Sequence, residues 1–144
     1  MASIFDVAKY ILNKCGRIST MKLQKLCYYC QAWSLAWDEV PLFEEDFQAW
    51  ANGPVCPELF SFHKGKFLVD STLFNESQEY SFTENELETM DNVLKFYGDK
   101  EPQWLSELTH KEAPWREARH GISDGLRSDT VISKESMQQY YGGL

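Results

Sequence analysis

The chain has 144 residues, of which 43% are hydrophobic and 15% aromatic, and its formal net charge is −8. This length suits one compact domain, and the apolar content is sufficient for a hydrophobic core without disulfides or metals. The acidic balance disfavours nucleic-acid partners, because binding to a phosphate backbone depends on clusters of Lys and Arg. An acidic domain is instead steered towards basic macromolecules.

The N-terminal segment predicts a short amphipathic helix. Ser3 and Asp6 match an N-cap and its acidic partner, and Gly16 supplies a stop. The segment lacks the basic start and uninterrupted apolar run of a signal peptide, and no stretch approaches the roughly 20 apolar residues of a membrane span. We therefore expect a cytoplasmic protein with no membrane contact, whose four cysteines are free thiols.

A second helix without Gly or Pro is predicted from a cap at Ser19 or Thr20 to about Trp37. Helical projection places Cys27 and Cys30 within its apolar stripe. Because a second apolar patch lies beside this stripe, we expect the helix to be central to the fold.

The pattern then changes from helical to alternating. Residues 47–51 predict a short strand, and residues 52–54 predict a sharp corner whose first role is architectural. Trp50, just before the corner, is either a core residue or an exposed anchor. A helix that begins at Pro57 and ends by Gly65 follows.

The second half of the chain is predicted to be helical. Residues 66–82 form either an extended excursion or a weak hairpin around residues 75–77. Further helices are predicted after a cap at Thr83, from Pro102, from Pro114 and after a cap at Ser133. Together these elements predict a mainly α fold, a compact single-domain helical bundle over residues 1–144, with a short strand or small β-hairpin around residues 47–51.

The Cys27-x-x-Cys30 pair is the first candidate for a chemical site. A zinc site needs three or four ligands, usually from two close pairs, and this chain has one such pair. A redox pair needs its first cysteine at a helix N-terminus, whereas Cys27 lies about two turns inside a helix. We interpret both thiols as small core residues, with a metal or redox role as the weaker alternative.

Other catalytic patterns are weaker still. The sequence has neither a nucleophile elbow nor a phosphate-binding glycine loop, so no catalytic residue, cofactor or metal is predicted. A hydrolase or metalloenzyme built from Cys27, Cys30, Cys56 or His110 stays an alternative. Residues 44–46 are interpreted as a solvated acidic turn in preference to a cation site, and His110 as a polar clasp between two helices in preference to a functional histidine.

Four blocks of sequence resemble the Panacea domain: MKLQKLCYYCQAWSLAW (21–37), FQAWANGPVCPELFSFHKG (47–65), LSELTHKEAPWREARHG (105–121) and ISKESMQQYY (132–141). The most specific pieces are Lys25-Leu26 with Tyr28-Tyr29, Ala49-Trp50 with Gly53-Pro54-Val55, and Thr109-His110 with Pro114-Trp115. This family includes SocA-like antitoxins and GepA-type phage-associated proteins.

The resemblance implies a mainly helical antitoxin from a bacterial or phage-borne toxin–antitoxin pair, which neutralises a cognate protein toxin by direct contact. Toxins paired with this family include small alarmone-synthetase-like enzymes that modify tRNA. SocA-like members instead act as adaptors that deliver a toxin to a protease. The family pattern requires no cysteine at Cys27 or Cys30 and implies no catalytic residue.

Partner-binding residues are predicted among the family blocks, because Trp, Tyr and Arg dominate the hot spots of interfaces. The candidates, several of which are expected to be core residues, are Lys22, Lys25, Tyr28, Gln31, Trp50, His110 and Trp115. Tyr28 and Gln31 are preferred over the cysteines, because they project about 100° or more away from the direction of Cys30.

Overall fold

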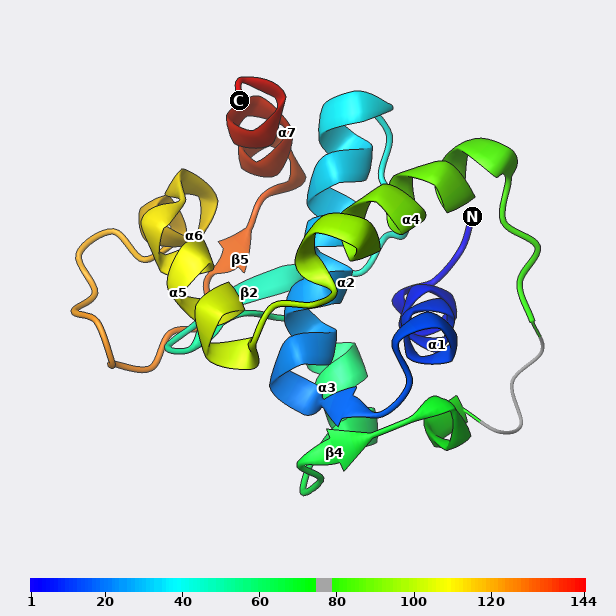
Figure 1. Cartoon of the computed structure of the whole chain (residues 1–144). Coiled ribbons are helices and arrows are strands. Elements are labelled where there is room, and N and C mark those ends of the chain that lie inside the picture. Colours follow the sequence, from blue (N-terminus) through cyan, green and yellow to red (C-terminus); the bar gives the residue numbers. More distant parts are fainter. Residues whose placement is uncertain (75–78) are drawn as a thin grey trace.

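The computed structural model describes residues 1–74 and 79–144, so the weak hairpin predicted around residues 75–77 lies outside the described residues. In Figure 1 the helices pack around one long central helix, and small antiparallel sheets lie beside it. The helices are α1 (Ile4–Cys15), α2 (Thr20–Trp37), α3 (Pro57–His63), α4 (Glu84–Tyr97), α5 (Pro102–Lys111), α6 (Ala113–Ala118) and α7 (Lys134–Gly142), with a 3-10 turn η1 (Ser71–Phe74). The predicted mainly α class with a small β component is confirmed.

The helix boundaries follow the capping residues of the sequence. Ser3 and Thr83 each form a complete capping box at the start of α1 and α4. Ser19 and Ser133 cap α2 and α7 by accepting a hydrogen bond from a backbone N–H one turn inside each helix. These side chains satisfy donors that the first helical turn leaves without partners, so the predicted starts of these helices are confirmed.

Helix α2 is central to the fold, as its two apolar sides predicted. It packs against α1, α4, α5 and α7 and against strand β3 (Gly53–Val55). Cys27 and Cys30 are fully buried on it, in the same core cluster as the apolar side chains of its neighbours. Their interpretation as core residues is therefore confirmed.

Two small antiparallel sheets complete the described fold. Strand β2 (Phe47–Trp50) lies between β3 and β5 (Val131–Ile132), and β1 (Ile18–Ser19) pairs with β4 (Leu68–Val69). The strand predicted at residues 47–51 is confirmed, and it belongs to a hairpin. The structure differs from the sharp corner predicted at residues 52–54, because Gly53 and Pro54 belong to β3, the second strand of that hairpin.

The remaining strands are two residues long and were not predicted, since so short a stretch carries no alternating pattern. Within the described residues, no helix combines the length and apolar character needed to cross a membrane.

Candidate functional site

The β2–β3 hairpin is held in place by side chains from α5, α6 and the residue after α6. Each donates to a backbone carbonyl of the hairpin: Ser106 Oγ to Asn52 O at 2.6 Å, Trp115 Nε1 to Trp50 O at 2.8 Å, and Arg119 Nη1 to Ala49 O at 2.9 Å. Residues about 60 positions away in sequence thereby hold the hairpin, and α2 packs against its strand β3 as well.

Lys25 reaches the hairpin from α2. Its side chain is 1% exposed, and Nζ donates to the carbonyl of Pro54 at 3.1 Å. No carboxylate of the described residues forms an ion pair with it. Burial in this apolar setting lowers the pKa of Lys25 to about 7, because the charged amine loses its hydration.

Gly53 makes this approach of Lys25 possible. A Cβ at position 53 would lie 2.6 Å from Lys25 Cε, well inside van der Waals contact. The φ angle of Gly53 is also +117°, in a region that residues with a Cβ rarely adopt. The glycine predicted as an architectural element therefore also provides the space for the lysine.

A second polar side chain of α2, Gln24, connects the hairpin to α3. The backbone N–H of Cys56 donates to Gln24 Oε1 at 2.9 Å, which fixes the orientation of the amide. Gln24 Nε2 then donates to Cys56 O at 3.2 Å and to His63 Nε2 at 3.0 Å. His63 is therefore neutral with its proton on Nδ1, and burial lowers its pKa further.

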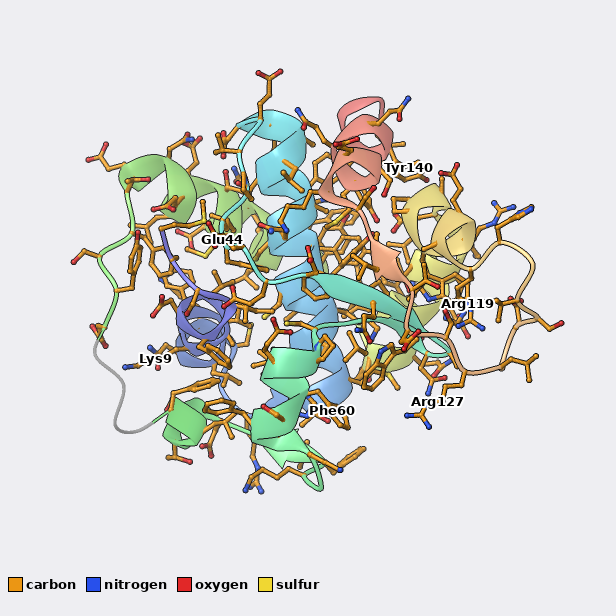
Figure 2. The ribbon with its side chains drawn as sticks, turned by 180° about the vertical axis from the view of Figure 1, so that it is seen from behind. Lys9, Glu44, Phe60, Arg119, Arg127 and Tyr140 are labelled. Atoms are coloured by element: carbon orange, nitrogen blue, oxygen red, sulfur yellow. The ribbon has the colours of Figure 1, made fainter. Side chains whose placement is uncertain are left out.

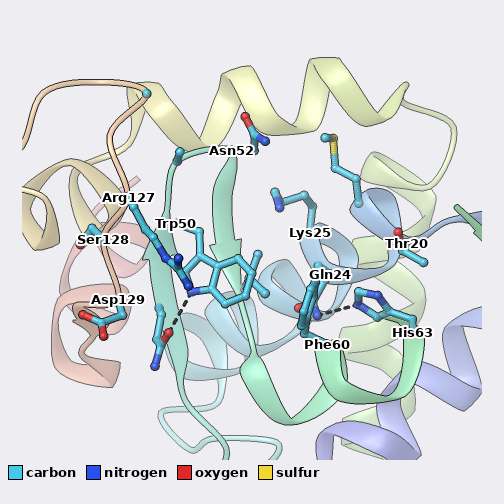
Figure 3. Close-up of a pocket in the computed structure, with 15 residues that line it drawn as sticks. Thr20, Gln24, Lys25, Trp50, Asn52, Phe60, His63, Arg127, Ser128 and Asp129 are labelled. Atoms are coloured by element: carbon cyan, nitrogen blue, oxygen red, sulfur yellow. Dashed lines mark hydrogen bonds between the residues drawn. The ribbon is translucent and has the colours of Figure 1, made fainter. Parts of the chain in front are cut away.

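A cavity of about 870 Å³ opens beside these residues. Figure 3 shows Lys25 and Asn52 at one end, with Phe60 and His63 across from the loop that carries Arg127. The Trp50 ring lies between these sides and meets Phe60 edge to face, with centroids 5.0 Å apart. The cavity thus combines an aromatic wall with a buried amine.

The loop on the far side of the cavity is tied down by Arg119. This buried guanidinium donates through Nη2 to Ser123 O at 3.0 Å and to Leu126 O at 2.6 Å. Figure 2 shows Arg119 and Arg127 on the same side of the molecule, next to this loop. Arg127 and Asp129 line the cavity from it, so the rim carries one charge of each sign.

Only some of the predicted partner-binding residues gather at this cavity. Lys25 and the half-buried Trp50 line it. Trp115 is buried behind the hairpin, and the ring of His110 stacks on it at 4.0 Å with an interplanar angle of 21°. His110 bonds to the backbone of Ala51, so it holds the hairpin, whereas the sequence predicted a polar clasp between two helices.

The preference for Tyr28 and Gln31 as contact residues does not fit their burial. Tyr28 is fully buried, and its hydroxyl lies within hydrogen-bond distance of the Tyr141 hydroxyl, at 3.1 Å. Gln31 bridges Phe43 O and Leu42 N, each at 2.7 Å. Both side chains project about 100° or more away from the direction of Cys30, yet neighbouring elements cover them there as well.

Lys22 lies elsewhere, beside a separate shallow depression that Asp91 also lines. The expectation that several candidates would be core residues is confirmed, because Lys25, Tyr28, Gln31 and Trp115 are all buried.

Cys27, Cys30 and Cys56 are buried, and Cys15 is half-buried. Burial raises the pKa of the Cys56 thiol to about 12, and it raises those of Cys27 and Cys30 as well. No group of potential metal ligands is found among residues 1–74 and 79–144. In the acidic triplet, Glu45 accepts from the Ile4 N–H at 3.1 Å and Asp46 pairs with Lys134 at 2.7 Å, so these two carboxylates have local partners.

Sequence reasoning missed Gln24, Phe60, His63 and Arg127 as parts of this site. A signal existed for Gln24, because it precedes Lys25 on a helix whose other sides are apolar, and adjacent polar residues in such a helix suggest a buried polar contact. No comparable signal marked Arg127, since a loop is placed by tertiary contacts.

One comparison with known proteins gives a match. Searches of curated proteins and of solved structures each found no match. The family model described as "Antitoxin SocA-like, Panacea domain" matches residues 23–116. This stretch contains most of α2, the hairpin, α3 and the Trp115 anchor, whereas the block at residues 132–141 lies outside it. Since the match covers more than half of the chain, the protein belongs to the family of SocA-like antitoxins with a Panacea domain.

Proposed function

We propose that this protein is the antitoxin of a toxin–antitoxin pair and that it neutralises its cognate toxin by direct protein–protein binding. The observation that carries the proposal is the family match over residues 23–116, which spans the β2–β3 hairpin, Ser106 and Trp115 that hold it, and most of the cavity wall. We further propose that residues 1–144 act as one cytoplasmic domain. An alarmone-synthetase-like toxin that modifies tRNA stays a prediction.

The surface around the cavity is the proposed contact with the toxin. It presents the half-buried Trp50 and the exposed Arg127, two residue types that are enriched in interface hot spots. The hairpin beneath them is anchored by three side-chain bonds, so little ordering is needed when a partner binds. The net charge of −8 would speed encounter with a basic toxin.

The test is co-expression with the neighbouring open reading frame. If the proposal holds, the neighbour alone arrests growth, co-expression restores growth, and the two proteins purify as a stoichiometric complex. A neighbour that is harmless, or one that is toxic but not rescued, would contradict the proposal.

Co-expression in protease-deficient cells distinguishes direct neutralisation of the toxin from its delivery to a protease. A protease adaptor shortens the half-life of the toxin and loses its protective effect in protease-deficient cells. Direct neutralisation persists in such cells, and the toxin level is unchanged.

The hydrolase or metalloenzyme alternative is tested with a Cys27→Ala/Cys30→Ala variant and a metal analysis of the purified protein. Burial and the raised pKa of both thiols favour a structural role. We therefore expect the variant to neutralise the toxin normally and the protein to contain no stoichiometric metal.

A further inference from the structure

We propose that the cavity beside the β2–β3 hairpin binds a carboxylate carried on an aromatic or apolar body, and that Lys25 receives the carboxylate. This inference concerns the isolated protein and does not depend on the antitoxin function. Lys25 has unmet bonding capacity, the cavity has an aromatic wall, and its rim carries charged side chains.

The amine of Lys25 has bonding capacity that the protein does not use. An ammonium group carries three N–H donors, and the structure gives Nζ one acceptor, the carbonyl of Pro54 at 3.1 Å. The side chain is 1% exposed, and nothing in the described part of the chain neutralises its charge. An unpaired buried charge is costly, so an anion in the cavity would be strongly favoured.

The walls of the cavity suit a flat or apolar body attached to that anion. Trp50 and Phe60 meet edge to face at 5.0 Å, and both are half-buried. Trp50 Nε1 already donates to Gln48 Oε1 at 2.8 Å, which fixes the ring and occupies its only donor. Trp50 therefore offers a ring surface to a ligand and no polar group.

The charges favour a monocarboxylate over a phosphate. A phosphate carries nearly two charges and three acceptor oxygens, and proteins hold it with several cations or backbone N–H groups. Here one ammonium lies within the cavity and one guanidinium, Arg127, lies at its rim, while Asp129 opposes additional negative charge. One carboxylate matches the two unused N–H donors of Lys25.

Binding is expected to be coupled to a proton. The titratable groups that lie close enough to Lys25 to interact with its charge are His63 on α3 and His110 on α5, and Arg127 and Asp129 line the cavity from the loop. The hairpin lines the cavity with residues that do not titrate. Burial lowers the pKa values of both histidines, so neither gains a charge near pH 7.

Lys25, with a pKa of about 7, is thus the group that takes up a proton when a carboxylate binds. Affinity is expected to be greatest below pH 7 and to fall by up to about tenfold per pH unit above it.

The test uses phenylacetate as the probe and phenylacetamide as its neutral counterpart. Binding is followed at pH 6.0 and pH 8.0 by calorimetry and by the indole N–H signal of Trp50 in NMR spectra. We expect saturable binding of phenylacetate, weakened about tenfold at pH 8.0 and with net proton uptake there, and binding of phenylacetamide at least about tenfold weaker at pH 6.0.

The matched variants are Lys25→Met, which keeps the length of the side chain without its charge, and Lys22→Met, which removes a charge elsewhere on α2. Lys25→Met is expected to bind phenylacetate at least about tenfold more weakly, and Lys22→Met to bind it normally. If Lys25→Met does not fold, proton uptake by the unaltered protein on binding phenylacetate at pH 8.0 shows whether Lys25 receives the carboxylate.

The proposal is overturned if phenylacetate does not bind at pH 6.0, if phenylacetamide binds equally well, if Lys25→Met binds normally, or if inorganic phosphate binds more tightly than phenylacetate. The source of the natural carboxylate is identified by repeating the titration on the toxin complex. Exclusion of the probe assigns the carboxylate to a toxin residue, and unchanged binding assigns it to a free small molecule.

Discussion

The indole N–H of Trp115 donates to the backbone carbonyl of Trp50 at 2.8 Å, and so α6 holds the last residue of β2. The Trp115 ring is itself stacked on His110, and the guanidinium of Arg119 lies 5.0 Å from its centroid. The indole is therefore both a donor to the hairpin and a packing surface for its neighbours.

Trp115→Phe separates these two roles, because phenylalanine retains a ring and lacks the N–H. We expect the free energy of unfolding to fall by about 2 kcal/mol, since a hydrogen bond is lost and some ring volume with it. Urea denaturation measures the change, and Trp37→Phe, at a side chain that is 51% exposed, is the control with little effect. Equal stability of the two variants would contradict an anchoring role for Trp115.

Gly53→Ala tests the close approach of Lys25 to the hairpin. The new Cβ would lie 2.6 Å from Lys25 Cε at a φ of +117°, so both a clash and backbone strain are introduced. Gly65→Ala is a matched control, because Gly65 also has a positive φ of 84° but no atom within 4 Å of the added Cβ. We expect Gly53→Ala to lower the unfolding free energy by about 2 kcal/mol more than Gly65→Ala does. Similar losses of unfolding free energy in the two variants would show that the Lys25 side chain moves away from the added Cβ at little energetic cost.

Sequence reasoning predicted the helices well because their signals are local. The capping boxes at Ser3 and Thr83 and the opening prolines of α3 and α5 act within one turn, so they can be recognised without tertiary contacts. The paired two-residue strands β1 and β4 depend on a partner about 50 residues away. Nothing within either stretch indicates that pairing.

The candidate site was predicted only in part, because it too depends on contacts between segments that are distant in sequence. Lys25, Trp50 and Trp115 were selected from the family blocks, but whether each lies in the core or at the surface depends on what packs around α2. A helical projection gives directions relative to one axis and does not show which directions are covered. Tyr28 and Gln31 illustrate this, since α7 and the segment at residues 42–43 bury them.

The lowered pKa of Lys25 predicts a pH dependence of stability. The folded state releases the proton at about pH 7, whereas the unfolded chain keeps it up to its ordinary value of 10.5. Between these values the unfolded state binds more protons, so this group makes the protein more stable as pH rises. The unfolding free energy of the natural protein minus that of Lys25→Met should increase from pH 7 to pH 9, by up to about 1.4 kcal/mol per unit. Parallel stability curves for the two proteins would show that Lys25 stays charged when folded.

Glu112 is expected to have the opposite effect on stability, because it makes the protein less stable as pH rises. It is 6% exposed and accepts 2.7 Å hydrogen bonds from the hydroxyls of Tyr29 and Tyr141, and burial outweighs these bonds to raise its pKa. The folded state therefore holds the proton above the ordinary value of 4.5, and this contribution to stability is lost as pH rises through the raised pKa.

Glu112→Gln keeps an acceptor oxygen for both tyrosines and removes the buried charge. We expect it to be at least as stable as the natural protein at pH 7, with its advantage growing from pH 4 to pH 7. Glu112→Ala leaves both hydroxyls without this acceptor and should cost on the order of 3 kcal/mol. Thermal and urea unfolding across this pH range measure both effects, and a Gln variant as unstable as the Ala variant would mean that the carboxylate charge itself is needed.

The proposed toxin contact predicts unequal effects of charge reversal at two basic residues. Arg127 is exposed on the rim of the cavity, whereas Lys22 lies at the other depression, so Arg127→Glu should weaken the toxin complex about tenfold or more and Lys22→Glu should not. The measurements are the dissociation constant of the purified complex and growth rescue in co-expression, with circular dichroism to confirm that both variants fold. If Lys22→Glu abolishes the complex and Arg127→Glu does not, the toxin binds at the depression beside Lys22, and the cavity is left to the carboxylate ligand alone.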